Sequence, residues 1–207
     1  MKRTKSKTGI IQSSIDVKSW LQRVPDVGEV RPGQCPWCEA ASRPPGKGLG
    51  ILGHGLRERQ QWGPVEADGA PAMVNLRVRR FQCCTCDGVI TVVPCGVVRK
   101  RLYSGAAIAY TLALFGIVRC SARATRRRVS PLAVVGYTAA AGWAALRRWV
   151  LAMRKGTLFG CVRAAPLSWT AREIAARAAT TLAACAPPTL RGLALEAQAF
   201  IGGARMA

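Results

Sequence analysis

Acidic residues are scarce in this sequence. Its 207 residues include 10 Asp and Glu against 31 Lys and Arg, which gives a formal net charge of +21. After Asp87 the only carboxylates are Glu173 and Glu196, so the later part of the chain cannot assemble a two-metal carboxylate site. A positive field of this strength attracts polyanions, of which nucleic acid is the commonest. An anionic membrane surface is the competing interpretation of the same charge.

The sequence also lacks a secretory leader and a long hydrophobic run. The amino terminus, MKRTKSKTG, is basic and no apolar stretch follows it, so we expect a reducing, cytoplasmic environment. One nearly uncharged segment, Leu102 to Val118, has about 17 residues, the lower limit for crossing a bilayer, and is rich in Ala, Gly, Ser and Thr. It predicts a buried helix, and we expect no membrane partner.

Nine cysteines are present, four of them in two closely spaced pairs. The pairs Cys35-Pro-Trp-Cys38 and Cys83-Cys-Thr-Cys86 supply the four thiolates that tetrahedral Zn²⁺ prefers. They predict a structural zinc ion, because four thiolate ligands leave no open position for water or substrate. The pairs are separated by about 44 residues, which exceeds the usual spacing of about 15–20. An insertion at residues 44–52 or 63–72 would explain the difference.

Several residues compete with this interpretation. Cys84 could replace Cys83, although its spacing to Cys86 suits a knuckle turn less well, and His54 and Cys95 are further candidate ligands. A thioredoxin-type redox motif is the alternative for the first pair, but no βαβ pattern surrounds it. The remaining cysteines are interpreted as small buried hydrophobic residues: Cys120, Cys161 and Cys185.

The texture of the chain predicts an α+β protein, with a small amino-terminal zinc ribbon of β-hairpins followed by an all-α bundle of Arg- and Ala-rich helices. Alternation over Leu76–Cys83 and Val89–Val93, on either side of the turn at Asp87-Gly88, predicts one hairpin. The expected domains are a basic arm at 1–30 with a short helix or strand around 15–24, a zinc-ribbon-like domain at 31–101, an Arg-rich helical domain at 102–160, and Ala-rich helices at 161–207.

Three later helices are predicted from caps and periodicity. One begins at Thr138 as N-cap and runs to Arg154, with an apolar stripe that we expect in the core: Ala139, Trp143, Leu146, Val150 and Met153. A second begins at Thr170, where Glu173 completes a capping box, and runs to about Ala184. The last covers Arg191 to Phe200.

Four segments in order, CPWC, HGLRER, VRRFQCCTCDGVITVVPCGVVRKRLYS and GWAALRRWV, carry a family resemblance. Over about Pro32 to Arg154 the chain resembles the amino-terminal zinc-ribbon and helix-turn-helix portion of bacterial insertion-sequence transposases, and related transposon-associated zinc-ribbon domains of unknown function. The resemblance implies zinc ligation by Cys35, Cys38, Cys83 and Cys86, a helix-turn-helix-like bundle as the DNA-binding domain at 102–160 with its recognition helix at Thr138–Arg154, and association with the bacterial nucleoid. The family's separate ribonuclease-H-like cutting domain uses three carboxylates, and we expect no such domain here because only Glu173 and Glu196 follow Asp87.

These observations together predict sequence-directed binding of double-stranded DNA by a transposase-like protein without a catalytic centre of its own. Its protein partner would be a separate transposase or a second copy. In a helix-turn-helix one helix enters the major groove while its neighbours fix phosphates, and both roles suit Arg. The candidate DNA-binding residues are Arg77, Arg79, Arg123, Arg126, Arg127, Arg128, Arg147, Arg148 and Arg154.

Other interpretations of the same features stay open. The chain could be an RNA-binding basic zinc protein, or a non-catalytic subunit of a nucleic-acid enzyme. An enzyme that acts on nucleic acid through His54, Asp68 or Asp87 is a further alternative, although these residues show no paired spacing. A solvated basic surface without any ligand is the simplest alternative to binding.

Overall fold

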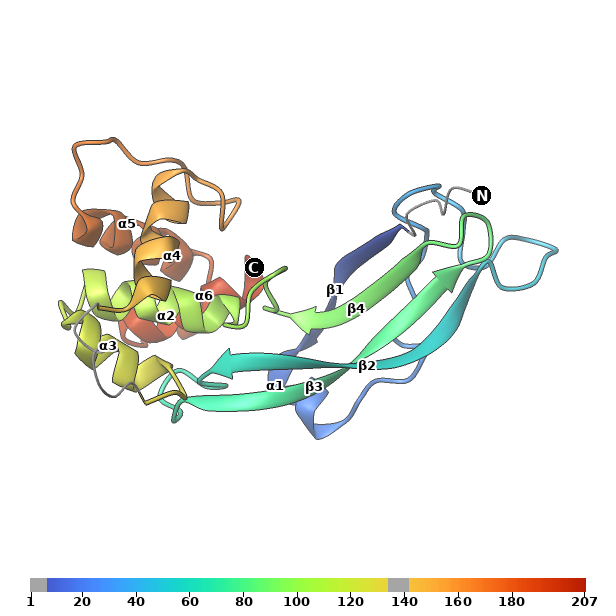
Figure 1. Cartoon of the computed structure of the whole chain (residues 1–207), viewed down its shortest axis with the longest axis horizontal. Helices are drawn as coiled ribbons and strands as arrows, with labels where there is room; N and C mark the ends of the chain where they lie inside the picture. The colour runs from blue at the N-terminus through green and yellow to red at the C-terminus, as the bar shows by residue number, and fades with distance from the viewer. Residues whose placement is uncertain (1–6, 134–141) are drawn as a thin grey trace. The chain divides into compact units, whose positions relative to one another are not determined.

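The computed structural model describes residues 7–133 and 142–207, and the chain divides into two compact units. Unit 1 comprises Met1–Gln60 and Asn75–Cys95, and unit 2 comprises Gln61–Val74 and Gly96–Ala207. The boundary crosses two long strands, β2 (Ile51–Gly63) and β3 (Ala72–Cys83), so residues 61–74 at their far end belong to unit 2. The sheet and the helices of Figure 1 confirm the mixed α+β class.

Unit 1 is built on a four-stranded sheet in the order β1-β4-β3-β2 (Figure 1). Strand β3 pairs antiparallel with β4 (Val89–Cys95), with Phe81 opposite Ile90, which confirms the predicted hairpin. Strand β4 has a neighbour on each side and is correspondingly apolar: Ile90, Val92 and Val93 are almost fully buried.

The remaining strand of this sheet lies in the segment that the sequence assigns to a basic arm. Strand β1 (Thr8–Asp16) runs parallel to β4, and Thr8 lies opposite Val89. Asp16 then caps α1 (Val17–Gln22), whose Trp20 is buried and donates a hydrogen bond from Nε1 to the Arg77 carbonyl at 3.0 Å. Residues 8–16 therefore form a strand of the sheet and not part of a basic arm, whereas α1 lies within the segment 15–24 for which a short helix or strand is expected. Residues 1–6 lie outside the described residues.

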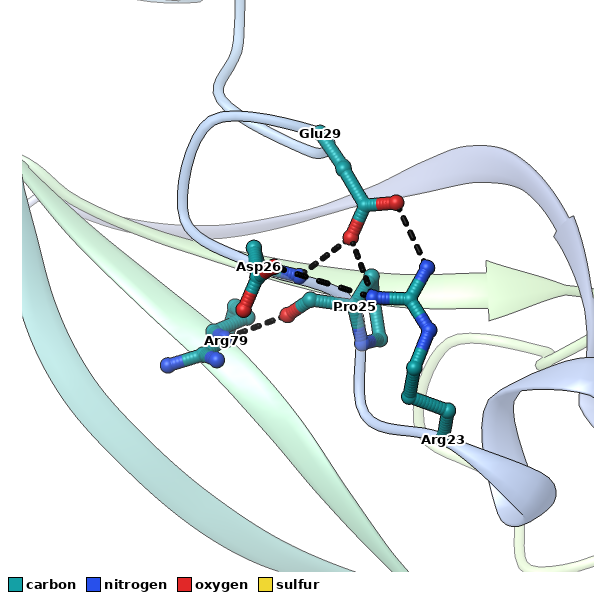
Figure 2. A network of polar contacts seen from close by, with 5 residues as sticks. All are labelled: Arg23, Pro25, Asp26, Glu29 and Arg79. Atoms are coloured by element: carbon teal, nitrogen blue, oxygen red, sulfur yellow. Dashed lines mark hydrogen bonds and ion pairs between the residues drawn. The ribbon is translucent and has the colours of Figure 1, made fainter.

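A polar network holds the loop that follows α1 (Figure 2). The two terminal nitrogens of Arg23 donate to the two carboxylate oxygens of Glu29 at 2.9 and 2.6 Å, and the Asp26 N–H donates to the same carboxylate at 2.5 Å. Arg79 on β3 donates from Nε to the Pro25 carbonyl at 2.8 Å. These bonds tie the loop to the sheet.

Unit 2 surrounds one buried helix, α2 (Gly105–Gly116). Every residue of α2 except Phe115 is buried, which confirms the helix predicted within Leu102–Val118. It packs against α5 (Ala171–Ala184) and α6 (Leu195–Arg205), which also contact each other (Figure 1). The described residues of this unit also form α3 (Ala122–Val129) and α4 (Ala144–Arg154), with a short 3-10 turn at Pro188–Leu190.

None of the helices within residues 7–133 and 142–207 is both long and apolar enough to cross a membrane.

Aromatic side chains form the core beneath α4. The ring of Tyr103 meets Trp62, Trp143 and Trp149 edge to face, at centroid distances of 5.5, 5.9 and 5.0 Å. This geometry is the favoured one for aromatic pairs. The stripe predicted on this helix is buried at Trp143, Leu146, Val150 and Met153, which confirms its place in the core.

The helix boundaries agree with the sequence where a side chain forms a cap. Thr170 and Glu173 form the predicted capping box, and α5 ends at Ala184 as expected. The predicted start of α4 is wrong, because Gly142 has a left-handed φ of 70° and Trp143 is extended, so the helix begins at Ala144. Thr138 and Ala139 lie outside the described residues.

The last helix also differs from its prediction. It begins at Leu195 instead of Arg191 and continues to Arg205 instead of Phe200. The Gln198 side chain donates to the carbonyls of Arg191 and Leu193 at 3.1 and 2.7 Å, and so holds those residues in a turn before the helix.

Small residues let α6 approach two neighbours closely. A Cβ on Gly202 would collide with the Leu182 carbonyl oxygen of α5, and a Cβ on Gly203 would collide with the Ala109 side chain of α2. The Ala- and Gly-rich composition of these helices therefore reflects short distances between backbones.

We predict that Gly202→Ala destabilises the protein by about 1–3 kcal/mol, the usual cost of overpacking, in spite of the better helix propensity of Ala. Gly192→Ala is the matched control, because no atom lies within 4 Å of the added Cβ. Urea unfolding of both variants measures the difference. Equal stability of the two variants would contradict the close helix packing.

The Glu29 network predicts a pH dependence of stability. The Arg23 side chain, followed by the Asp26 N–H, lowers the pKa of Glu29 from 4.5 to about 2. A lowered folded-state pKa stabilises the fold above pH 4.5, and this contribution is lost as pH falls from 4.5 towards 2. At pH 7 the free energy of unfolding should therefore be higher for wild type than for Glu29→Gln. The difference should be modest, because the Arg23–Glu29 ion pair is exposed. The difference should shrink at pH 3, and a gap independent of pH would contradict the assignment.

Candidate metal centre and exposed arginines

Four thiols from two distant segments meet in unit 1. Cys35, Cys38, Cys83 and Cys86 have their Sγ atoms within 4.8 Å of one another. The Cys35–Cys86 and Cys38–Cys83 Sγ pairs are each 3.6 Å apart, although the members of the second pair are separated by 45 residues. Two of the thiols, Cys35 and Cys83, are fully buried.

The two knuckles have the same backbone geometry. In the first, the Glu39 N–H donates to the Cys35 carbonyl at 3.0 Å, and the Cys35 N–H donates to the Ala40 carbonyl at 3.0 Å. In the second, Asp87 and Gly88 take the same positions relative to Cys83, with distances of 3.0 Å for both bonds. Glu39 and Asp87 both adopt left-handed φ angles, of 58° and 54°. The repeated turn places the thiols of both knuckles around one point.

Backbone N–H groups surround the sulfurs. Ala40 donates to the Cys38 thiol and Gly88 donates to the Cys86 thiol, again in equivalent positions. Burial raises the pKa of Cys83, but N–H groups of Thr85 and Cys86 and the neighbouring thiols lower it from 9.0 to about 7. Such donors favour thiolate, the form of cysteine that binds metal.

The cluster has the opposite effect on Cys38. The Ala40 N–H lowers the pKa of this thiol, but burial and the three other thiols raise it to about 12. Negative charge on four neighbouring sulfurs is stabilised by a nearby cation, and a divalent metal ion bound here would supply it.

These residues fit a tetrahedral metal ion. A Zn–S bond of about 2.3 Å places the sulfurs of a regular tetrahedron about 3.8 Å apart. The Cys35–Cys86 and Cys38–Cys83 Sγ distances, both 3.6 Å, agree with this value. The arrangement could therefore hold a metal ion with only small movements, and four protein ligands make its role structural.

A tryptophan inside the first knuckle connects the centre to the sheet. A Cβ on Gly88 would lie 2.5 Å from Cε3 of Trp37, and one on Gly9 would lie 2.8 Å from Cζ2 of the same ring. The indole therefore lies against the second knuckle and against β1. The sequence interpretation assigned no role to Trp37, although a bulky side chain between the first two cysteines could have indicated one.

The structure decides between the competing ligands. Among the residues it describes, the four cysteines are the one group of three or more His, Cys, Asp or Glu side chains placed to hold a metal ion. Cys84 is exposed and its thiol lies 3.6 Å from the Leu49 carbonyl, so Cys83 is the cluster member. His54, Asp68 and Asp87 are exposed, and they form no such group.

Two expectations about the cysteines and their spacing need correction. Cys120, Cys161 and Cys185 are half-buried instead of buried. The extra length between the knuckles lies mostly in the strands themselves, because β2 and β3 have 13 and 12 residues. The predicted insertion at 63–72 coincides with the connection between these strands.

The predicted DNA-binding arginines have different environments. Arg77 is exposed on β3, whereas Arg79 is half-buried and bonded to Pro25. Arg154 on α4 donates to the Leu167 and Trp169 carbonyls at 3.1 and 2.7 Å, so Arg79 and Arg154 stabilise loops. Arg126 on α3 is half-buried. The remaining members are exposed on α3 and α4: Arg123, Arg127, Arg128, Arg147 and Arg148.

We predict that the purified protein binds one zinc ion per chain and that Cys38→Ser reduces this content strongly. The apparent free energy of structural zinc binding is about 10 kcal/mol or more in small zinc domains, so loss of a ligand should also lower Tm. Cys84→Ser is the control, because Cys84 lies beside the ligands but outside the cluster. Metal analysis and thermal unfolding provide the measurements. Equal zinc loss in both variants would refute the ligand assignment.

Comparison of the chain with protein-family models, with curated proteins and with solved structures gave no match. Two features of the chain bear on its function, the cysteine cluster in unit 1 and the exposed arginines in unit 2.

Proposed function

We propose that this protein binds double-stranded DNA through exposed arginines of unit 2, and that unit 1 is a zinc ribbon with a structural role. One observation carries the proposal. Helices α3 and α4 expose five arginines, and neither helix contains an acidic residue that would neutralise them. Phosphate contacts by Arg supply most of the affinity of such interfaces.

Duplex DNA is favoured over duplex RNA by the secondary structure that carries the arginines. The major groove of B-DNA is about 12 Å wide and admits an α-helix. The corresponding groove of A-form RNA is too narrow and deep for side chains to read. Arginines on helices therefore suit the DNA groove better.

The order of features supports a transposase-like origin. Two Cys-x-x-Cys knuckles flank a long hairpin, and Arg-rich helices follow. We infer a DNA-binding protein related to the amino-terminal part of insertion-sequence transposases, acting as a regulator or beside a separate transposase. The scarcity of carboxylates after Asp87 supports a non-catalytic role.

We predict that affinity for duplex DNA falls steeply with salt. Each phosphate contact contributes a slope of about −0.9 in a plot of log K against log salt, so a slope steeper than about −3 corresponds to more than three contacts. Fluorescence anisotropy at salt concentrations from roughly 50 to 300 mM provides the measurement. Parallel titrations use duplex RNA and single strands. Tighter binding to duplex RNA, or a flat salt dependence, would contradict the proposal.

A further inference from the structure

We propose that α3, together with the turn before it, is the element that enters the DNA major groove, and that α4 is not the recognition helix. This inference rests on the proposed function, because it names the surface that would perform it. The sequence alone favours Thr138–Arg154 for this role, so the structure leads to a different assignment.

The connections between helices favour α2 and α3 as the helix-turn-helix pair. Five residues, Ile117 to Ser121, join these helices, and the helices pack against each other. Fourteen residues, 130–143, separate α3 from α4. The turn in helix-turn-helix units is short, about 3–4 residues, so the first connection is much closer to that geometry.

The burial pattern of α3 leaves its arginines facing outward. Thr125 and Val129, four residues apart, are fully buried and define the inner face. Arg123 and Arg127, also four residues apart, are exposed on the opposite face. The helix has eight residues, and the diameter of an α-helix with its side chains, about 10–12 Å, fits the major groove, which is about 12 Å wide. Arg can form bidentate hydrogen bonds with guanine in this groove.

Contacts with α2 and an N-cap hold this helix in place. The Cζ atom of Arg128 lies 5.8 Å from the centroid of the Tyr110 ring of α2, within the range of cation–π contacts. The Ser121 side chain accepts a hydrogen bond from the Ala124 N–H at 3.1 Å and caps the helix. A helix fixed at both ends presents its arginines with little loss of conformational freedom on binding.

The turn contributes a further arginine at an unusual backbone position. Arg119 is exposed and has a φ of 62°, a left-handed conformation that glycine adopts far more easily. Strained residues of this kind concentrate at functional sites. We infer that the Arg119 side chain contacts a phosphate at the edge of the groove.

Helix α4 is less suited than α3 to enter the DNA major groove. Its exposed face includes Leu151, which is 50% exposed, and the uncharged Ala144. Its third arginine, Arg154, is held by two carbonyls of a following loop. Only Arg147 and Arg148 are left for DNA.

Two double variants with equal loss of charge test the assignment. Arg123→Ala/Arg127→Ala removes the centre of the α3 surface, and Arg147→Ala/Arg148→Ala removes the same charge from α4. Removal of two positive charges that face the duplex should lower the steepness of the salt dependence by up to about 1.8 and weaken binding by up to about 60-fold at roughly 0.1 M salt, the values for two neutralised phosphates. We expect this result for the α3 pair, and a change of only a few-fold for the α4 pair, measured by anisotropy on duplex DNA.

The outcomes separate this inference from the proposed function. Failure of the wild-type protein to bind duplex DNA overturns both. Binding by wild type with an equal or larger loss in the α4 pair overturns only the assignment of α3. Both double variants should have the circular dichroism spectrum and the Tm of wild type, because the substituted residues are exposed and Ala is the best helix former.

Arg119→Gly provides an independent test, because this variant should fold at least as stably as wild type. Glycine relieves the left-handed strain, so its Tm should equal or exceed that of wild type. We expect DNA binding to weaken several-fold at the same time. Unchanged affinity in a stabilised variant would overturn the role of Arg119.

Discussion

The convergence of two identical turns on one set of four thiols is the constraint on which unit 1 depends. The same surroundings lower the pKa of Cys83 to about 7 and raise that of Cys38 to about 12, so the cluster favours thiolate at one sulfur and opposes it at another. A divalent cation held there would stabilise all four thiolates and would join chain segments that are 45 residues apart.

The same centre explains why an amino-terminal strand belongs to this unit. Parallel pairing of β1 with β4 brings Gly9 beneath Trp37, and Trp37 also lies against Gly88. The metal ligands, the indole and the first strand therefore form one continuous contact. Such an arrangement depends on contacts between three distant segments, so the local sequence of residues 8–16, which is short and only partly apolar, gives little sign of it.

Local signals predicted much of the structure, and distant contacts account for the rest. The cysteine spacing identified the cluster, and the Thr170–Glu173 capping box gave both the start and the type of α5, because each pattern involves residues close in sequence. The start of α4 could not be predicted in this way. Its N-cap residue, Trp143, forms no side-chain cap and is fixed by packing against Tyr103 and Trp149. Tertiary packing of this kind leaves no local signal in the sequence from which the start of the helix could be predicted.

The arginines show why net charge overstates the size of a binding surface. Arg79, Arg154 and Arg172 each donate to backbone carbonyls, and Arg172 also lies 4.4 Å from the Phe115 ring centroid, at the end of α2. A guanidinium used in this way satisfies carbonyls that a helix or loop leaves without partners, and it is no longer available to a phosphate. Part of the charge of +21 therefore stabilises the fold. The salt dependence of binding should reflect the exposed arginines on short, fixed elements and not the total number of basic residues.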